Sequence, residues 1–466
     1  YVPEVYEKLA QGIEKHAECL SPHISKSKRV TAYKKIYTSP HPILIITTPQ
    51  YAYLERSDTQ TIILERSGSS NWIERTRPYL DHSKVLQQLS RQTGRVCILG
   101  DILPRTEDLH ASREETISAL EEPPKRLALK AKFRIIKEEH KPTKEEPFKL
   151  FFAETVKRIQ TVLNRQENVF FYAARRGLAP LIVCFDCGTI VKSPESGAPY
   201  SLLRTQKNGE EYRWFVDRNS GKRTRAADTC ENCGSWRLQE RGIGIQHIQD
   251  ACAKFFPNTP VVCFDNTTAD TPKKARELQK QMQTARGSIF LGTISALPYL
   301  PEQVTTTCIT SLEATQSIPS WRADEMLLRL LLELREKSTL EVIAQTRSEV
   351  PEILSYATQG QVEKFYNEEL SLREMLNYPP FSRLILLTWQ ETTASEGISS
   401  TEELLKNKLT DYQTQYYTSP LSTTQKYIRH CLLRIPKSQW PEQNLRRIFS
   451  ELPPYIKIQL DPDRII

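Results

Sequence analysis

The sequence predicts an α/β protein with parallel sheets, a cysteine-rich insertion in its second lobe and a small α+β domain at its C-terminal end. Three observations predict this fold class. Short apolar, β-rich runs alternate with helical patterns, which is typical of parallel sheets covered on both faces. Two Cys-x-x-Cys pairs interrupt the second set of these runs. The last part of the chain alternates strand and helix patterns, with too few strands for a doubly wound sheet.

The first lobe is predicted over residues 1–110. A helix over 83–91 would connect its parallel strands. The following segment, 111–147, is rich in charge and proline, so we interpret it as a linker or a solvated surface excursion. The strands of this lobe are predicted from three apolar runs, at 43–48, 61–64 and 96–99.

The second lobe is predicted over residues 148–356, with helices at 148–165 and 324–337. The cysteine-containing segment, 184–236, would be an insertion at the carboxyl edge of a strand, where α/β folds place their working loops. The strands of this lobe are predicted at 169–173, 181–183, 261–264, 288–291, 306–310 and 340–345.

The C-terminal domain is predicted over residues 357–466, beginning with a helix at 362–376. The run Tyr378-Pro-Pro-Phe381 should end this helix and lead into the first strand, because paired prolines cannot continue a helix. The other predicted elements are strands at 384–389, 427–434 and 455–460 and helices at 401–415 and 439–450.

Four cysteines arranged as two Cys-x-x-Cys pairs predict one structural zinc site. Each pair lets two sulfurs reach one metal, and two pairs complete a tetrahedral shell with no position left for water. A glycine follows each pair, as a tight metal-binding turn favours. The alternative is four free thiols. The predicted ligands are Cys184, Cys187, Cys230 and Cys233.

Composition limits the classes of protein to which the chain could belong. Its 466 residues suffice for about three domains. No apolar run approaches the ~20 residues needed to span a bilayer. A net charge of +8 favours a polyanionic partner such as nucleic acid, although an ordinary soluble surface could also carry it. Six further cysteines are scattered irregularly, which is typical of reduced thiols in a cytosolic protein. They are Cys19, Cys97, Cys252, Cys263, Cys308 and Cys431.

Several distinctive motifs occur in order along nearly the whole chain. They are Phe170-Phe-Tyr-Ala-Ala-Arg-Arg-Gly-Leu-Ala-Pro180, Cys-x-x-Cys-Gly, Arg241-Gly-Ile-Gly244, Phe365-Tyr-x-Glu-Glu-Leu-x-x-Arg373, Tyr378-Pro-Pro-Phe-x-Arg383-Leu and Leu460-Asp-Pro462. Together they resemble the motifs of the bacterial PriA family of replication-restart proteins. The chain starts at Tyr1 rather than Met, and the order of motifs leads us to expect that it begins inside the first lobe.

The resemblance implies a superfamily 2 helicase with two RecA-like lobes, the first one incomplete here. It also implies a zinc-ribbon insertion and a role in reloading the replicative helicase at abandoned forks and D-loops. Family members hold two zincs in the insertion. Here the second set of ligands is lost, so the resemblance implies one zinc per chain. The positions that match the lost ligands are Ser193, Ser196, Asp217 and Ser220.

The nucleotide motifs of that family are degraded in this chain. Its Asp-Glu-Glu-His box falls on Leu64–Ser67, and a leucine cannot coordinate magnesium. Its coupling motif falls on Gly100–Pro104, and a Lys-Gly pair falls on Pro298–Tyr299. Its arginine-finger segment falls on Glu333–Lys337, which has the pattern of a plain amphipathic helix. We therefore expect neither ATP nor Mg²⁺ as a cofactor.

Five basic residues are candidates for contacts with DNA. Two follow a strand and could bind phosphate or simply form an exposed pair. Three others lie near two tryptophans in a pattern that can stack on unpaired bases, although a solvated loop with packed tryptophans explains the same pattern. The candidates are Arg175, Arg176, Lys222, Arg223 and Arg225, with Trp214 and Trp236.

These features predict a replication-restart factor that binds DNA as a scaffold without helicase activity. Its expected partners are forks, D-loops, single-strand/duplex junctions, primosome proteins and the replicative helicase. We expect a monomer in the cytoplasm, associated with the nucleoid and not with a membrane. Two alternatives remain, namely a working 3′→5′ helicase whose motifs are misaligned and a zinc-ribbon adaptor outside replication.

Overall fold

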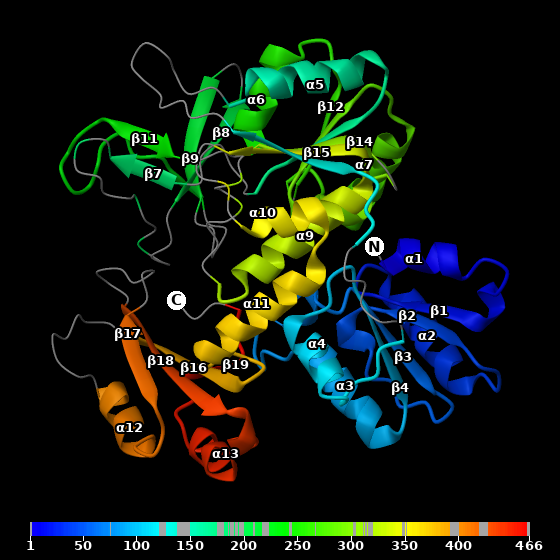
Figure 1. Ribbon diagram of the computed structural model, residues 1–466, viewed down its shortest axis with the longest axis vertical. Helices are drawn as coiled ribbons and strands as arrows, with labels where there is room; N and C mark the ends of the chain where they lie inside the picture. The colour runs from blue at the N-terminus through cyan, green and yellow to red at the C-terminus, as the bar shows by residue number, and fades with distance from the viewer. Residues whose placement is uncertain are drawn as a thin grey trace. The chain divides into compact units, whose positions relative to one another are not determined.

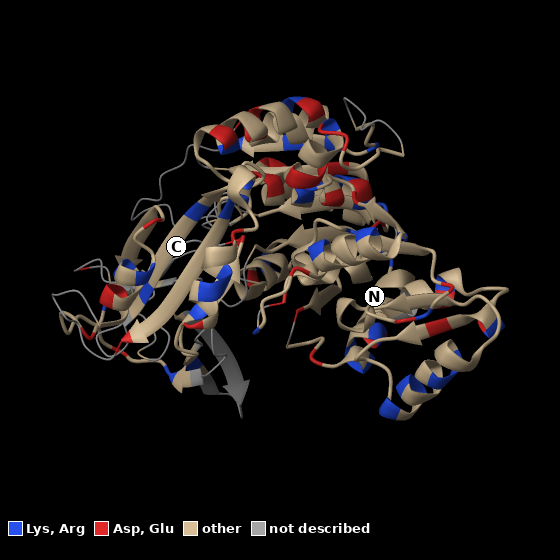
Figure 2. Cartoon of the chain, turned by 90° about the horizontal axis from the view of Figure 1, so that it is seen from below, with Lys and Arg blue, Asp and Glu red and all other residues tan. Residues whose placement is uncertain are grey.

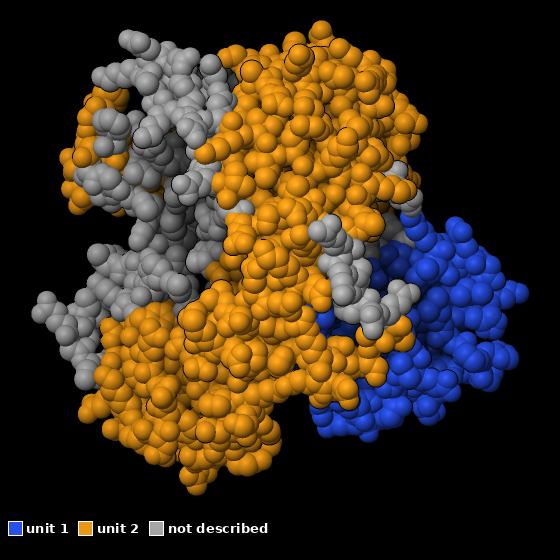
Figure 3. Space-filling view, viewed as in Figure 1, with its two compact units in different colours: residues 1–109 blue, residues 110–466 orange. Residues whose placement is uncertain are grey.

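The computed structural model describes two compact units, residues 1–109 and 110–466, which are treated separately below (Figure 3). Among the helices that the structure describes, none has the length and apolar character that a membrane crossing requires. The described residues are 2–463 except 75, 121–126, 138–149, 175–180, 185, 187–190, 192–193, 195–199, 208–209, 217–222, 242–244, 266, 302–303, 311, 313–314, 316–319, 347–349, 351, 392–399 and 419–426.

The first unit contains two pairs of parallel strands, β1 with β2 and β3 with β4 (Figure 1). Its helix α3 packs against β3 and β4 and is capped at its start by the Asp81 carboxylate, which accepts the N–H groups of Ser83 and Lys84. The elements are α1 (Val2–Leu9), β1 (Ala17–Leu20), α2 (Lys26–Thr38), β2 (Leu44–Thr47), β3 (Thr61–Glu65), α3 (His82–Thr93), β4 (Val96–Gly100) and α4 (Thr106–Arg113).

The prediction that this first sheet is covered on both faces is wrong. Ile63 on β3 is 66% exposed and Val96 on β4 is 58% exposed, whereas Leu64 on β3 is 1% exposed. Neighbouring residues of a strand point to opposite faces, so only one face of this pair is buried. A run of apolar letters does not distinguish a strand buried on both faces from one buried on a single face.

The second unit is built on a six-stranded parallel sheet in the order β12-β13-β6-β14-β15-β5. A large apolar core joins this sheet to α5 and α6. The α/β fold class is therefore confirmed. The elements are β5 (Lys132–Lys137), α5 (Ala153–Asn164), β6 (Val169–Tyr172), α6 (Ile245–Phe255), β12 (Val261–Phe264), α7 (Pro272–Thr284), β13 (Ile289–Gly292), the 3₁₀ helix η4 (Ile294–Tyr299), β14 (Val304–Ile309), α9 (Ala323–Lys337) and β15 (Ser338–Thr346).

Strand β5 lies inside the segment 111–147, which the sequence predicted as a linker. It is an edge strand paired with β15, and its sequence Lys-Phe-Arg-Ile-Ile-Lys buries Phe133 and Ile136. Charged residues are common on edge strands because they oppose further pairing. Because of these charged residues, the sequence pattern of β5 resembled that of a linker rather than that of a strand.

The cysteine-rich insertion leaves the second lobe through a two-stranded antiparallel stem, β7 (Leu181–Cys184) with β11 (Leu238–Arg241). It also contains a three-stranded antiparallel ribbon in the order β10-β9-β8. A small apolar cluster that includes Ile182, Tyr200 and Phe215 forms its core. The ribbon strands are β8 (Ser201–Lys207), β9 (Glu210–Val216) and β10 (Arg223–Arg225).

The C-terminal part is a four-stranded antiparallel sheet in the order β17-β18-β16-β19. Residues of α12 and α13 join an apolar core with one face of this sheet, around Trp389 and Leu433. The segment Tyr378–Phe381 connects α11 to β16 as predicted. The elements are α10 (Ile353–Gln359), α11 (Val362–Met375), β16 (Ser382–Glu391), α12 (Ser400–Lys408), β17 (Thr414–Thr418), β18 (Tyr427–Pro436), α13 (Gln443–Ser450) and β19 (Lys457–Leu460).

Candidate functional site

Three of the four predicted metal ligands lie together. The ligand atoms of Cys184, Cys230 and Cys233 are all within 4.8 Å of one another, and the sulfurs of Cys184 and Cys233 are 3.5 Å apart. Four sulfurs at ~2.3 Å from one zinc would be about 3.8 Å apart, so this spacing fits a shared ion. The fourth predicted ligand, Cys187, is outside the described residues. The cluster could hold one metal ion and is compatible with zinc.

Backbone geometry shapes the second Cys-x-x-Cys pair. The N–H of Gly234 donates to the carbonyl of Cys230, and the N–H of Cys230 donates to the carbonyl of Ser235, both at 2.8 Å. Gly234 has a φ of +71°, a left-handed conformation that glycine adopts without strain. This turn brings Cys230 and Cys233 to the same side, as a metal-binding knuckle requires.

A carboxylate that sequence reasoning missed joins the two cysteine pairs. Asp186 lies between the cysteines of the first pair and accepts hydrogen bonds from the Ser235 hydroxyl and from Nε and Nη2 of Arg237. The N–H of Arg237 in turn donates to the Ser235 hydroxyl at 3.0 Å. Such contacts around metal ligands hold the ligands in position. In the sequence, this contact could have been suspected from an acid within the first pair, Asp186, and from Ser235-Trp-Arg237 shortly after the second pair.

The ribbon places one candidate DNA-binding arginine beside an aromatic residue. Arg225 on β10 pairs directly with Trp214 on β9, and Tyr212 occupies the same face of β9 two residues away. Arg225 is exposed, whereas Trp214 and Tyr212 are half-buried. The neighbouring Phe215 points the other way, into the small core of the insertion. This face thus combines a cation with partly accessible rings.

The structure gives less information on the other candidate DNA-binding residues. Arg223 pairs with Val216 in the ribbon. Trp236 is 78% exposed just after the second cysteine pair. Outside the described residues lie the candidates Arg175, Arg176 and Lys222 and the lost ligand positions Ser193, Ser196, Asp217 and Ser220.

In the first unit, the segment Leu64–Ser67 lies at the carboxyl end of β3, beside the carboxyl end of β4, at the edge of the sheet where α/β folds bind ligands. Leu64 is 1% exposed there and supplies no oxygen. The N–H of Ser67 donates to the carbonyl of Gly100 at 3.0 Å, and the N–H of Gly68 donates to the Asp101 carboxylate at 2.7 Å. The loops that follow the two strands are therefore tied to each other by hydrogen bonds within the protein.

In the second unit, the segment Glu333–Lys337 lies in α9. The guanidinium of its arginine, Arg335, donates hydrogen bonds to backbone carbonyls. Arg335 is 7% exposed and donates to carbonyls at the start of β5 and the end of α10. Desolvation lowers the pKa of this guanidinium from its ordinary value. The accepting carbonyls are those of Leu129, Ala131, Ala357 and Thr358.

The two positions that match the family's Lys-Gly pair are Pro298 and Tyr299 in this chain. Pro298 and Tyr299 lie in η4, where the Tyr299 ring stacks on Phe264 with centroids 4.7 Å apart. At the end of β13, a Cβ on Gly292 would come within 2.9 Å of the carbonyl of Phe264, so the backbone approach there requires glycine. The residue after the position that matches a family lysine thus packs against Phe264 of β12.

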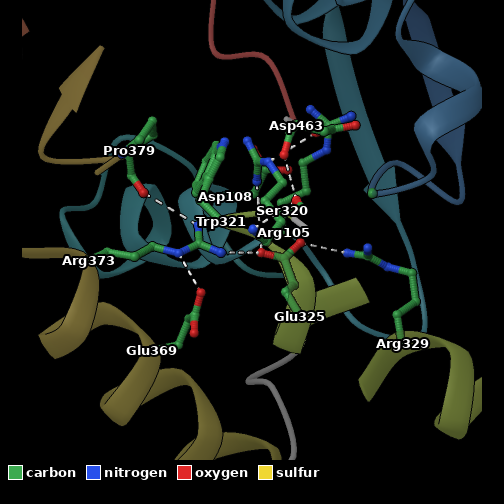
Figure 4. Close-up of polar contacts among 12 residues, drawn as sticks. Arg105, Asp108, Ser320, Trp321, Glu325, Arg329, Glu369, Arg373, Pro379 and Asp463 are labelled. Atoms are coloured by element: carbon green, nitrogen blue, oxygen red, sulfur yellow. Dashed lines mark hydrogen bonds and ion pairs between the residues drawn. The ribbon is translucent and has the colours of Figure 1, made fainter. Parts of the chain in front are cut away.

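The motif residues that carry the family resemblance meet in a buried ionic network (Figure 4). Arg373 on α11 donates to Glu325 of α9 at 2.8 Å, to Glu369 at 2.6 Å and to the carbonyl of Pro379 at 3.4 Å. Glu325 also accepts from Arg329 at 3.0 Å. Burial raises the pKa of Glu369, and Arg373 opposes that rise. The network fixes α11 to α9.

The terminal Leu-Asp-Pro motif extends this network. Trp321 donates to the carbonyl of Pro462 at 2.7 Å, and its ring lies under the guanidinium of Arg373 at 4.8 Å. Asp461 accepts from Arg383 at 2.6 Å and from the N–H of Leu384 at 2.9 Å. These motifs are therefore structural, and they hold the C-terminal sheet against α9 and α11.

The chain is similar to curated bacterial proteins described as replication restart protein PriA. It is 23% identical to that of Borreliella burgdorferi over 379 residues, which cover 79% of this chain and 54% of the relative. It is 26% identical to that of Chlamydia trachomatis (66% of this chain, 41% of the relative) and 21% identical to that of Thermotoga maritima (83% and 52%). The chain is thus PriA-like and divergent, and it spans about half the length of these relatives.

Two other comparisons add no support. No family model matches the chain. A solved structure of S. cerevisiae Dbp5 bound to RNA and ADP BeF3 aligns over 80% of this chain and 78% of that one, with 7% identity and a TM-score of 0.37. That likeness is too distant to carry an argument about fold or function.

Proposed function

We propose that the chain is a replication-restart factor that binds DNA at forks and D-loops as a scaffold and does not hydrolyse ATP. The observation that carries this proposal is Leu64, a buried leucine at the strand end where the family positions its magnesium-binding carboxylates. Without such a carboxylate, the metal that bridges the β and γ phosphates has no protein ligand at this position.

A second observation supports the loss of catalysis independently. A finger arginine must reach the γ-phosphate with an available guanidinium fork. The arginine of the matching segment, Arg335, instead donates to four backbone carbonyls. Removal of an arginine finger alone costs on the order of 10³ or more in rate, so the two losses together leave little prospect of turnover.

In this proposal the insertion is a zinc-stabilised DNA contact. Cys184, Cys187, Cys230 and Cys233 hold one zinc, which contributes folding free energy and no chemistry. Near it, Arg225 neutralises phosphate while Trp214 offers a ring to unpaired bases. Arg175, Arg176, Lys222 and Arg223 remain further candidates. Reloading of the replicative helicase with primosome proteins, and a location at the nucleoid, follow from the family and belong to the same proposal.

The test measures fork binding and DNA-stimulated ATP hydrolysis on one preparation of the protein. We expect forked DNA to bind with an affinity that falls steeply as salt rises, because contacts to phosphate release counterions. ATP hydrolysis should stay at background with and without DNA. Stimulated hydrolysis would overturn the scaffold proposal in favour of a working helicase. Absent or salt-insensitive fork binding would overturn the replication-restart assignment.

A matched pair of variants tests the ribbon contact. Arg225→Gln should weaken fork binding and reduce the slope of log affinity against log salt by about 1. Arg213 lies on the opposite face of β9 and pairs with Asp228 at 2.7 Å, so Arg213→Gln removes the same charge away from the proposed contact. Equal effects from the two variants would count against this face.

A further inference from the structure

Helix α2 of the first unit carries an unusual concentration of positive charge. Its 13 residues, Lys26–Thr38, include five Lys or Arg and no Asp or Glu. The basic positions are coloured blue in Figure 2. None of the motifs that suggest a function lies in this helix, so its charge calls for a separate explanation.

Two of the five cations have partners within the unit. Arg29 donates to the hydroxyl of Tyr51 at 2.6 Å, and Lys35 pairs with Glu18 at 2.5 Å. The other three, Lys26, Lys28 and Lys34, are exposed. Within the part of the chain that the structure describes, no carboxylate forms an ion pair with any of these three. The protein therefore leaves three positive charges of one helix uncompensated.

Helix geometry spreads these three lysines over about 200° of the helix circumference, outside the buried face that carries Ala32 and Ile36. Lys26 and Lys34 are separated by about 12 Å along the axis and about 80° around it, and Lys28 lies about 120° beyond Lys34. The hydroxyl residues Ser27 and Thr31 fall between Lys34 and Lys28. A rise of about 12 Å corresponds to three or four phosphates of one DNA strand, which advance ~3.4 Å each. Lysines and hydroxyls are also the groups that commonly contact DNA phosphates.

This arrangement is unfavourable for the helix itself. The first turn of α2 contains no acid, and Lys26 and Lys28 lie near the positive end of the helix dipole. By contrast, α4 and α9 both begin with two acidic residues. Local rules of helix stability are most often broken where a residue serves binding. An external anion would offset the repulsion that these lysines create.

We propose that the exposed side of α2, defined by Lys26, Lys28 and Lys34, binds the phosphate backbone of DNA. This inference rests on the proposed DNA-binding function and adds a contact surface in the first unit. A membrane is a poorer fit, because helices that lie on membranes present a broad apolar face. In α2, Ala32 and Ile36 are buried inside the unit, and the exposed Val30 and Tyr37 do not form a broad apolar face.

The experiment compares two triple variants of the full chain that lose equal charge. The test variant is Lys26→Gln/Lys28→Gln/Lys34→Gln. The control variant changes three lysines of α7, two of which approach acidic neighbours at 4.0 and 2.9 Å. Duplex DNA binding is measured over a series of salt concentrations. The control substitutions are Lys273→Gln, Lys274→Gln and Lys280→Gln.

We expect the test variant to lose about 2 to 3 from the slope of log affinity against log salt, because each phosphate contact contributes ~0.9. The control should lose less than about 0.5 on the same scale. Circular dichroism and the melting temperature should be unchanged or slightly improved in the test variant, since it removes cations from the helix start.

The possible failures can be told apart. An unchanged slope in the test variant, or equal losses in both variants, would overturn this inference and leave the proposed function standing. Wild-type protein that binds no DNA would overturn both. Loss of binding to vesicles containing phosphatidylglycerol, with DNA binding intact, would assign the surface to a membrane and overturn the inference.

Discussion

Single residues decide what chemistry the nucleotide-motif positions can support. Leu64 and Ile63 are neighbours on β3, yet Leu64 is 1% exposed and Ile63 is 66% exposed. A carboxylate at position 64 of this chain would therefore be shielded from solvent. The sequence predicted the loss of magnesium binding from the leucine alone, and the structure adds that this leucine is part of the core.

The change Leu64→Asp should destabilise the protein and should not create ATP hydrolysis. A buried, unpaired carboxylate is expected to cost about 3 kcal/mol or more. Thermal denaturation and an ATPase assay measure the two effects. Ile63→Asp provides the control, since the same side chain on the exposed face should cost less than about 1 kcal/mol. A stable Leu64→Asp protein with magnesium-dependent hydrolysis would refute the structural role of Leu64.

The cysteine cluster makes a separate prediction about metal content. Purified protein should carry one zinc per chain, and Cys184→Ser should carry none, because a serine hydroxyl is a poor zinc ligand. Elemental analysis measures the metal. Cys252 is buried in the core of the second unit, away from the cluster, so Cys252→Ser should keep its zinc. Two zincs in the wild type, or metal retained by Cys184→Ser, would be inconsistent with the proposed site.

His430 on β18 should make stability depend on pH. Burial lowers the pKa of its imidazole from 6.5 to about 4, while its Nδ1 lies 2.9 Å from the Thr388 hydroxyl. Between these pH values the unfolded chain holds a proton that the folded chain does not. Stability is therefore complete above pH 6.5 and falls toward pH 4, by about 2 kcal/mol after allowance for partial screening. In His430→Gln, denaturant unfolding should vary less across this window, and an unchanged pH profile would disprove the assignment.

At the level of elements, the ionic network between α9 and α11 explains why the motif of α11 ends in an arginine. Arg373 and Glu325 are both 1% exposed. Removing one partner of a buried pair leaves the other charge uncompensated. The sequence identified this motif only as a family resemblance, because Arg373 and Glu325 lie 48 residues apart along the chain.

Replacement of Arg373 by leucine should cost about 3–5 kcal/mol, since Glu369 would lose the arginine that pairs with it and Glu325 would keep Arg329 but lose its pair with Arg373. The free energy of unfolding from a denaturant titration measures this loss. Lys364 on the same helix pairs only with exposed carboxylates, so Lys364→Leu should cost less than about 1 kcal/mol. Comparable losses in the two variants would mean that the network contributes little.

The buried central strands were predicted from the sequence, whereas two edge strands were missed for a physical reason. Strands such as β6 and β13 are buried along their whole length and read as continuous apolar runs. The edge strands β5 and β17 are half-exposed. Their mixed sequences were taken as a linker and as the end of a helix over 401–415, whereas α12 ends at Lys408. The cysteine site was predictable from spacing, but Asp186 was not, because its partners follow the second cysteine pair.

At the scale of the whole molecule, the altered nucleotide motifs lie in both units. Leu64 belongs to the first, and Arg335 and Tyr299 belong to the second. If the proposed loss of catalysis is right, a single substitution should not restore it. The insertion differs from both lobes in its small core, so we expect its stability to depend on a bound metal.

Metal removal should unfold the insertion and leave the large sheet intact. After treatment with a chelator, amide hydrogen exchange should accelerate in β7, β9 and β11 and remain slow in β6, β13 and β14. The latter strands belong to the extensive core of the second unit and serve as the internal control. Exchange that accelerates across all six strands would show that the insertion is integral to the lobe.

The two paired strands of its stem, β7 and β11, would allow the insertion to be removed or exchanged without changing the rest of the lobe. Leu181 and Arg241 are cross-strand partners, so the chain enters and leaves the insertion at adjacent points. A short hairpin turn could close the same gap, because antiparallel strands need only a two-residue connection. The sheet of the second lobe would then be tolerant of insertions that shrink, grow or are exchanged between relatives. Such tolerance offers a route by which ligand pairs of a metal-binding insertion can be lost one set at a time without disturbing the lobe that carries it.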